Sequence, residues 1–351
     1  MKNKASLQLS CPIPASEYDS IQLAHGGGGR LTAQLIDRMF LAALGNEFLE
    51  QAHDGAFLTM DTADLAFTTD SFVVDPLFFP GGDIGDLAIN GTVNDLACCG
   101  AIPRYLSLAF ILEEGLPMEK LWQVVLSIKK AAEKAGVKIV TGDTKVVEKG
   151  KGDGIFINTS GIGECIKGTR IAPERCRPGD LVLINGSIAE HGMAILSQRE
   201  GLGFSPAIKS DTASLSAMLN DLLHQISSVN VLRDPTRGGL ASALNEICGS
   251  SQTGIELLED KITVSEAVRG ACEILGLDPL YVANEGKVLI ILPEEDAEKA
   301  LKILRSHPEG AQSAIIGRVT DEHPGIVRLR TLVDSTRIVD MLTGEQLPRI
   351  C

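Results

Sequence analysis

Hydrophobic and polar positions alternate along the chain with helical and strand periods in turn, which predicts an α/β fold. The stretch "HGGGG" at 25–29 leads into an amphipathic helix that ends near residue 45. The segment 84–100 predicts a second helix, because four apolar or small residues recur at helical spacing and would face a core: Ile84, Leu87, Ala88 and Gly91. The strands predicted in this half are 65–75, 105–112, 137–144 and 154–165. The third of them ends in an acidic turn.

A second half begins at residue 177, where a Pro-Gly turn precedes an apolar run. A polar connection follows its first helix. The predicted elements are a strand that ends near 187, a helix over 189–199, a helix with a Gly/Pro-rich entry at Asp234, a strand and a helix over 286–307, and strands over 313–319 and 325–330.

These patterns divide the chain into four parts. Residues 1–20 form a polar extension broken by prolines, residues 21–168 the first domain, and residues 177–333 the second. From about Asp334 the pattern weakens, so residues 334–351 are predicted to be a flexible tail. Fully extended, about 18 residues reach about 60 Å, enough to cross an active-site cleft or contact a neighbouring protein.

Charge and composition exclude several classes of protein. The formal net charge of −14 disfavours a nucleic acid or an anionic membrane as partner, because both attract basic surfaces. No run approaches the roughly 18 apolar residues that a membrane span needs. The N-terminal apolar stretch is too short and too interrupted, by Gln8, Ser10 and prolines, for an export signal. We therefore expect a cytoplasmic protein.

Eight cysteines show neither C-x-x-C pairs nor matched histidine spacing, which removes the usual zinc and redox interpretations. They are Cys11, Cys98, Cys99, Cys165, Cys176, Cys248, Cys272 and Cys351. The last residue of the chain is unusual, because an exposed thiol at a mobile end is normally a liability. Either Cys351 has no role, or the tail is an arm that carries a group on sulfur.

Four aspartates stand at predicted element ends or turns: Asp54, Asp70, Asp95 and Asp234. Asp143 joins them in the acidic turn. Carboxylates brought together repel one another unless a cation such as magnesium neutralises them, although each could equally cap a helix or a turn. No P-loop sequence is present. Three candidates to hold phosphate remain: the backbone amides of residues 25–29, the turn at 80–82 with Asp83, and Lys145. The competing interpretation of residues 25–29 is a flexible loop without a ligand.

Six motifs in order resemble one family. They are "FTTDSFVVDP", "LAINGTVNDLACCGAIP", "VTGDTKVV", "LRDPTRGGL", "ANEGK" and the terminal "PRIC". They are similar to the hydrogenase-maturation carbamoyl dehydratases, the HypE family, within the superfamily of aminoimidazole ribonucleotide synthetase and selenophosphate synthetase. The resemblance runs from Ile21 to Cys351. Several of these motifs are shared across the superfamily, and "PRIC" singles out the dehydratases.

The resemblance implies a two-domain PurM-like fold, with an N-terminal α/β domain whose sheet pairs across a homodimer and a C-terminal α+β domain. It implies ATP and Mg²⁺, with magnesium ligands at Asp54, Asp70, Asp95 and Asp234. The nucleotide site implied by similarity is formed by Asp83, Asn90, Thr141, Asp143 and Lys145. The glycine-rich segment from His25 to Arg30, including Gly27 and Gly28, would close over the phosphates.

The resemblance also implies a reaction on the tail. A carbamoyltransferase, HypF, loads Cys351 with a carbamoyl group, ATP drives its dehydration to a thiocyanate, and the cyano group passes to iron on the HypC–HypD complex. Lys145 would offset phosphoryl charge. Glu285 is the candidate base, with His25 or His191 as alternatives. A structural ion pair of Glu285 with Lys287 is the competing interpretation.

Two other interpretations predict different residues. The first is another ATP-dependent enzyme of the same superfamily, such as selenophosphate synthetase or thiamine-monophosphate kinase. Selenophosphate synthetase carries a Cys or selenocysteine followed by Lys in its glycine-rich segment, and "HGGGGRLT" has neither. A metal chaperone would need two or more soft ligands near one another, and the tail "GEQLPRIC" supplies one.

Overall fold

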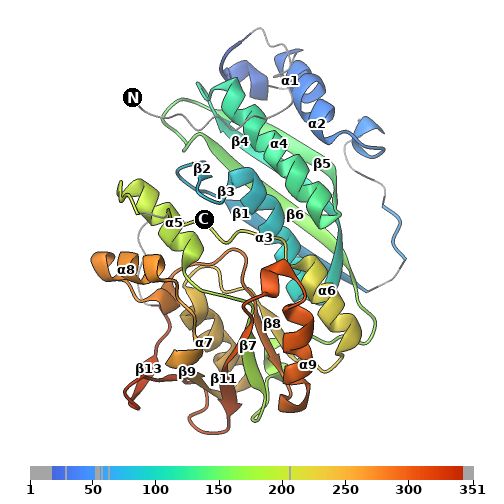
Figure 1. Ribbon diagram of the computed structural model, residues 1–351. Helices are drawn as coiled ribbons and strands as arrows, with labels where there is room; N and C mark the ends of the chain where they lie inside the picture. Colours follow the sequence, from blue (N-terminus) through green and yellow to red (C-terminus); the bar gives the residue numbers. More distant parts are fainter. Residues whose placement is uncertain are drawn as a thin grey trace.

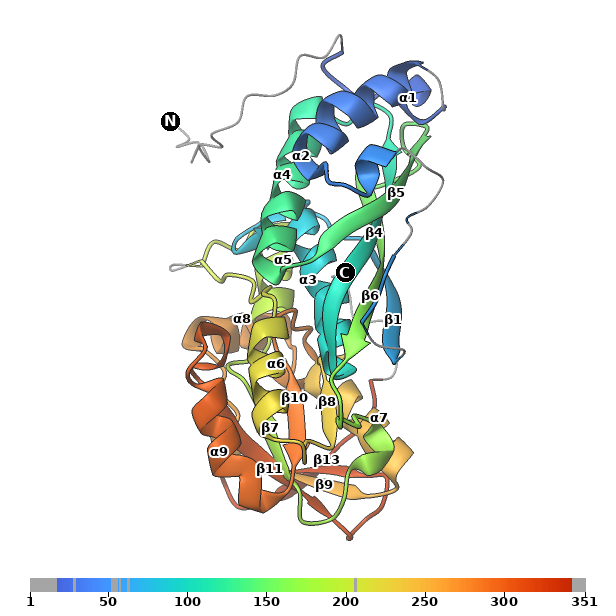
Figure 2. The ribbon, with the colours of Figure 1, turned by 90° about the vertical axis from the view of Figure 1, so that its right-hand side faces the viewer.

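The chain folds into two halves, each built on its own sheet, that lie one above the other (Figures 1 and 2). The computed structural model describes residues 18–27, 30–51, 56, 58–61, 64–204 and 207–342. The first sheet has the order β1-β6-β4-β5. Its strands are β1 (Leu65–Phe72), β4 (Ala101–Glu113), β5 (Lys138–Val147) and β6 (Ile155–Cys165). Only β4 and β5 of this sheet run parallel; the other neighbours are antiparallel.

Helices α3 (Ile84–Cys98) and α4 (Met118–Ala135) cover one face of this sheet (Figure 1). Side chains alternate along each strand, so Leu106, Leu108, Phe110 and Leu112 of β4 share the buried face. The opposite face leaves Leu65, Phe67 and Ile111 exposed by 47%, 68% and 43%. A sheet face that exposes several large apolar side chains is a surface that another layer can cover.

Helix α3 is buried on nearly every side, with 13 of its 15 residues in the interior. The four residues predicted to face a core, Ile84, Leu87, Ala88 and Gly91, are all buried, and nine others are buried with them. The C-terminal half covers the side of α3 that the sheet leaves open, because α6 (Ser216–Gln225) and β8 (Val231–Arg233) pack against it. The helix therefore forms a large part of the contact between the halves.

The N-terminal segment packs beside β5 as a series of short helices. After η1 (Leu23–Gly26), one continuous helical stretch consists of α1 (Arg30–Leu35), a π-helical turn (Ile36–Leu41) and α2 (Ala42–Leu44), and η3 (Leu49–Gln51) follows. Phe40 stacks on Phe110 of β4 with ring centroids 5.2 Å apart. The predicted helix after the glycine run is confirmed.

The C-terminal half holds a seven-stranded sheet in the order β13-β12-β9-β11-β7-β10-β8. Only β9 and β12 are parallel neighbours in it. Its strands besides β8 are β7 (Leu181–Ile184), β9 (Gly254–Leu258), β10 (Leu289–Leu292), β11 (Ala314–Thr320), β12 (Val327–Arg330) and β13 (Thr336–Val339). Its helices besides α6 are α5 (Glu190–Arg199), α7 (Gly239–Ser251), α8 (Glu266–Leu275) and α9 (Glu294–Leu304). The short elements of the chain are β2 (Phe78–Phe79), β3 (Gly82–Asp83), η4 (Pro173–Arg175), η5 (Glu259–Lys261), η6 (Pro279–Tyr281) and η7 (Pro308–Gly310).

Three expectations differ from the structure. The acidic turn predicted after 137–144 does not exist, because β5 continues to Val147 in register with β4. The polar connection after Arg199 contains α6, whose apolar residues pack against α9. Strand β13 lies beyond Asp334, so the ordered fold extends into the predicted tail. Among the described residues, no helix combines the length and apolar character needed to cross a bilayer.

Candidate functional site

The two halves enclose a pocket of about 250 Å³ whose wall is rich in carboxylates; we call it the acidic pocket. Four of the predicted site residues line it: Asp70, Asp95, Asp234 and Glu285. Its other lining residues are Thr69, Ser71, Phe72, Gly91, Arg233, Thr236 and Arg237. The structure therefore brings three of the four predicted aspartates into one pocket. Asp54 lies outside the described residues.

Each carboxylate reaches the pocket from a different element. Asp70 lies on β1 and shares the helix-facing side of that strand with Thr68. Asp95 lies in the last turn of α3. Asp234 follows β8 directly, and Glu285, which is 5% exposed, lies in the loop before β10. The pocket therefore depends on both halves of the chain.

Burial and mutual repulsion favour protonated carboxyl groups here. The pKa of Asp95 is raised to about 7, first by burial and then by the nearby Asp234 carboxylate. A hydrogen bond from Thr68 Oγ1 to Asp95 Oδ2, at 2.9 Å, acts in the opposite direction. Burial also raises the pKa of Asp70 and of Asp234. A bound cation would offset this cost.

Carboxylate oxygens are the ligands that magnesium prefers, so the residues of the acidic pocket suit that ion chemically. Within the described part of the chain, however, no three acidic, histidine or cysteine groups converge closely enough to form a complete metal site. Magnesium commonly keeps only one or two protein carboxylates and takes phosphate oxygens and water for the rest. The pocket fits that mode of binding.

A second pocket, of about 420 Å³, lies between β5 and the N-terminal helices; we call it the β5 groove. Thr141, Asp143 and Lys145 line it, and their spacing of two places them on one side of the strand. Lys145 Nζ lies 3.5 Å from Asp143 Oδ1, with both side chains about two-thirds exposed, so this ion pair holds Lys145 weakly. Gly26 also lines the groove.

Apolar side chains line the β5 groove from both sides: Phe40, Leu44, Phe48 and Leu49 come from the N-terminal segment, and Leu108, Phe110, Ile139 and Val140 come from the sheet. A flat ring against apolar side chains and an anion near a lysine are interactions that it can provide. Gly27 is exposed beside Gly26, and Gly28 lies outside the described residues.

Two other predicted nucleotide residues line neither pocket. Asp83 caps the N-terminus of α3, where its Oδ1 accepts the N–H groups of Gly85 and Asp86 at 2.7 and 3.1 Å. Asn90 Nδ2 donates to Thr212 Oγ1 at 3.4 Å. Thr141, Asp143 and Lys145 therefore share a groove that Asp83 and Asn90 do not line.

The two histidines considered as bases line neither the acidic pocket nor the β5 groove. His25 is 4% exposed, and its Nδ1 accepts the Gln22 N–H at 2.9 Å. Burial lowers its pKa. His191 is buried, with its Nδ1 2.8 Å from Ser210 Oγ. Cys351 lies outside the described residues.

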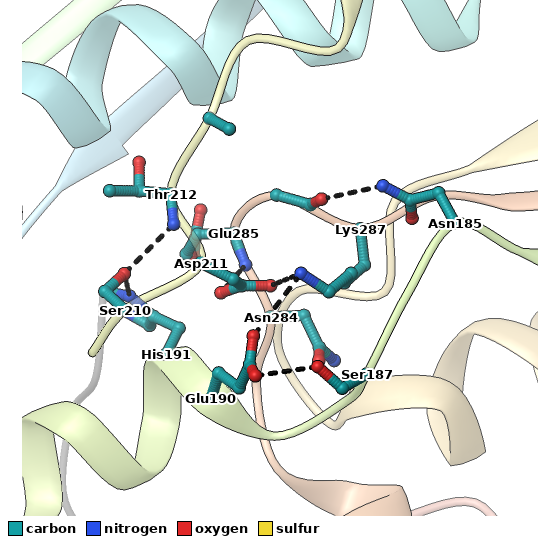
Figure 3. Close-up of polar contacts among 12 residues, drawn as sticks. Asn185, Ser187, Glu190, His191, Ser210, Asp211, Thr212, Asn284, Glu285 and Lys287 are labelled. Atoms are coloured by element: carbon teal, nitrogen blue, oxygen red, sulfur yellow. Dashed lines mark hydrogen bonds and ion pairs between the residues drawn. The ribbon is translucent and has the colours of Figure 1, made fainter. Parts of the chain in front are cut away.

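A cluster of charges that the sequence pattern does not predict lies beside Glu285 (Figure 3). Lys287 Nζ lies 3.0 Å from Asp211 Oδ2 and 3.6 Å from Glu190 Oε2. The structure thus gives Lys287 two carboxylate partners other than the expected Glu285. Arg237, on the wall of the acidic pocket, was also missed, although its place in "DPTRGG" three residues after Asp234 was a usable signal.

Comparison with known proteins places the chain in a family. A family model described as AIR synthase related protein, N-terminal domain, matches residues 52–165, and the corresponding C-terminal domain matches residues 177–330. The carbamoyl dehydratase HypE of Azotobacter vinelandii is 51% identical over 332 residues, which is 95% of this chain and 97% of the relative.

Solved structures agree with this match. A crystal structure of hydrogenase maturation protein HypE in complex with ATP is 52% identical, with a TM-score of 0.91, and the match covers 94% of this chain and 99% of that one. A HypE–HypF complex matches at 48% identity and a TM-score of 0.78, over 90% of this chain and all of that one. Both halves of the fold, and nearly the whole length, are therefore shared. The chain belongs to the HypE family of carbamoyl dehydratases and is built from the two PurM-like domains of the AIR synthase related proteins.

Proposed function

We propose that this protein is an ATP-dependent carbamoyl dehydratase that converts a carbamoyl group on Cys351 into a thiocyanate. The product would supply cyanide ligands to the iron of [NiFe] hydrogenase during maturation. The observation that carries this proposal is the acidic pocket between the halves, in a chain about half identical to HypE proteins, one of which was solved with ATP.

The chemistry requires an activated oxygen. The carbamoyl oxygen is a poor leaving group, so it attacks the γ-phosphorus of ATP, the bond to the β-γ bridging oxygen breaks, and ADP leaves. One N–H proton is lost, which gives an O-phosphorylated imidate. The C–O bond then breaks with loss of phosphate, and the second N–H proton leaves as the C≡N bond forms.

The acidic pocket suits the charges of this reaction. Asp70, Asp95 and Asp234, with Asp54, would hold magnesium, which when bound would offset the charge of the phosphates. Lys145 and Thr141 in the β5 groove would hold nucleotide, Lys145 by its positive charge. The reacting groups must also be shielded from water, which would otherwise accept the phosphoryl group. A tail that enters between the halves meets that need.

Glu285 would remove the two N–H protons in turn. It is nearly buried and lines the acidic pocket, so it lies where the charges of the reaction develop. His25 and His191 line neither pocket, which favours Glu285 over both. We expect Glu285→Gln to bind ATP with unchanged affinity and to slow dehydration at least a hundredfold.

The partners follow from the family and from one surface. A solved HypE–HypF complex supports HypF as the carbamoyltransferase that loads Cys351. The exposed apolar face of the first sheet, at Leu65, Phe67 and Ile111, supports a homodimer in which two such sheets pair. Delivery of cyanide to a HypC–HypD complex and the cytoplasmic location stay sequence predictions.

Intact-mass spectrometry tests the proposal directly. The purified chain is incubated with HypF, carbamoyl phosphate and Mg-ATP, and the modified peptide is located by fragmentation. We expect a carbamoyl adduct on Cys351 that loses the mass of one water only with hydrolysable ATP. Cys351→Ala should bind ATP and remain unmodified. An unmodified wild-type tail in the presence of active HypF would contradict the proposal.

A further inference from the structure

The loop at residues 284–287 presents different residues to two pockets. Glu285 lines the acidic pocket, whereas Gly286 and Lys287 line another pocket, of about 220 Å³. The orientation of Glu285 therefore depends on how the backbone of this loop is held. Asn185 binds one side of the loop, since its Nδ2 donates to Gly286 O at 3.0 Å.

Asp211 binds the other side of the loop at two points (Figure 3). Its Oδ1 accepts the backbone N–H of Glu285 at 3.1 Å, and its Oδ2 pairs with Lys287 Nζ at 3.0 Å. The Asp211 side chain is 2% exposed. Between these points the backbones nearly touch: a Cβ on Gly286 would lie 1.8 Å from Asp211 O, so only glycine fits.

Asp211 is itself fixed by the N-terminal half. It lies in the connector, which we define as residues 207–215. Ser210 N–H donates to Pro80 O at 2.7 Å. Asn94 of α3 donates from Nδ2 to Ala213 O at 2.9 Å and accepts the Leu215 N–H at 2.8 Å. Because Asn94 precedes Asp95, the connector links the placement of Glu285 to that of the metal-site carboxylate.

Stability is a poor reason to bury this ion pair, because desolvation of two charges offsets most of their attraction. Geometry is a better one. A carboxylate that accepts a backbone N–H makes a charge-assisted hydrogen bond with a preferred direction. We propose that Asp211 is a positioning residue, which holds the backbone of Glu285 so that its carboxyl group stays in the acidic pocket. This inference rests on the base role proposed for Glu285.

A double-mutant cycle tests it. Single-turnover dehydration of the HypF-carbamoylated protein is measured for wild type, Asp211→Ala, Glu285→Gln and the double variant. Asp211→Ala should lower the rate about 10- to 100-fold, the loss expected when a reacting group is displaced by about 1 Å. Its ATP dissociation constant should stay within twofold of wild type. In the Glu285→Gln background, the same change should cost less than twofold.

Two controls separate the possible failures. Glu190→Gln removes the other partner of Lys287 without touching the Glu285 N–H, and should keep the rate within threefold. If Asp211→Ala does not fold, Asp211→Asn takes its place, with a smaller loss, since it keeps one acceptor. Equal losses in both backgrounds would show that Asp211 acts independently and would overturn the inference. Absence of water loss in wild type would instead refute the proposed function.

Discussion

At the scale of single residues, Asp95 shows how the acidic pocket affects the free energy of unfolding. Burial and Asp234 raise its pKa from 3.8 to about 7. Between these two values the folded state keeps a proton that the unfolded state has released. The free energy of unfolding therefore falls as pH rises through this window, and the favourable contribution is complete only below the unfolded value. At pH 8 the folded protein carries a poorly solvated charge.

We therefore expect Asp95→Asn to stabilise the metal-free protein at pH 8, by about 1 to 2 kcal/mol once partial exposure is allowed for. The gain should be smaller at pH 5. Urea unfolding at both pH values measures it. Asp321→Asn, at an exposed position in the C-terminal half, is the matched control and should change little. A destabilised Asp95→Asn at pH 8 would contradict the pKa argument.

The same substitution should weaken binding of Mg-ATP at least tenfold, because a neutral amide is a poorer magnesium ligand than a carboxylate. Titration calorimetry with and without magnesium measures this. ATP binding without magnesium should change little. An unchanged magnesium-dependent affinity would remove Asp95 from the site.

At the scale of secondary-structure elements, α3 connects the sheet of one half to the connector of the other. Its first turn is held by Asp83, and its last turn carries Asp95. The family resemblance implies a nucleotide-site role for Asp83, whereas in the structure Asp83 caps the N-terminus of α3. Asn is as good a cap as Asp, so the two roles can be separated by substitution.

Asp83→Ala should lower the free energy of unfolding by about 1 kcal/mol, whereas Asp83→Asn should leave it nearly unchanged. Chemical unfolding of both variants measures the difference. We expect Asp83→Asn to bind ATP within twofold of wild type. A tenfold loss with Asn would restore the nucleotide role and make the cap incidental.

The elements also show what the sequence can and cannot predict. Segments such as 65–75 and 286–292 predict strands because the pattern of apolar residues that marks a strand lies within a few consecutive positions. Asp70, Asp95 and Asp234 were identifiable because motifs mark them. The network of Asp211, Lys287 and Asn185 was not, because its members lie far apart in sequence and no periodicity relates them. Helix α6 was missed because a long polar segment precedes it.

At the scale of the whole molecule, the sheet of the first half remains open on one face. Phe67 lies on that face and is 68% exposed. Phe67→Asp should weaken a homodimer at least tenfold, because it puts a charge into the surface that we propose is buried. Sedimentation velocity over a range of concentrations measures the shift. Leu332→Asp, at a 71% exposed apolar site in the other half, should leave the dimer intact.

The position of α3 has a consequence for synthesis on the ribosome. The hydrogen bond from Asn94 to Ala213 O cannot form until Ala213, 119 residues later in the chain, has been synthesised. At about 5 to 20 residues per second, translation takes about 6 to 24 s to supply it. During that time Ala97 and Cys98, which belong to the core cluster of the C-terminal half, have no C-terminal half to pack against. The nascent chain therefore exposes an apolar helix for seconds, which makes this interval the natural point for a chaperone to bind.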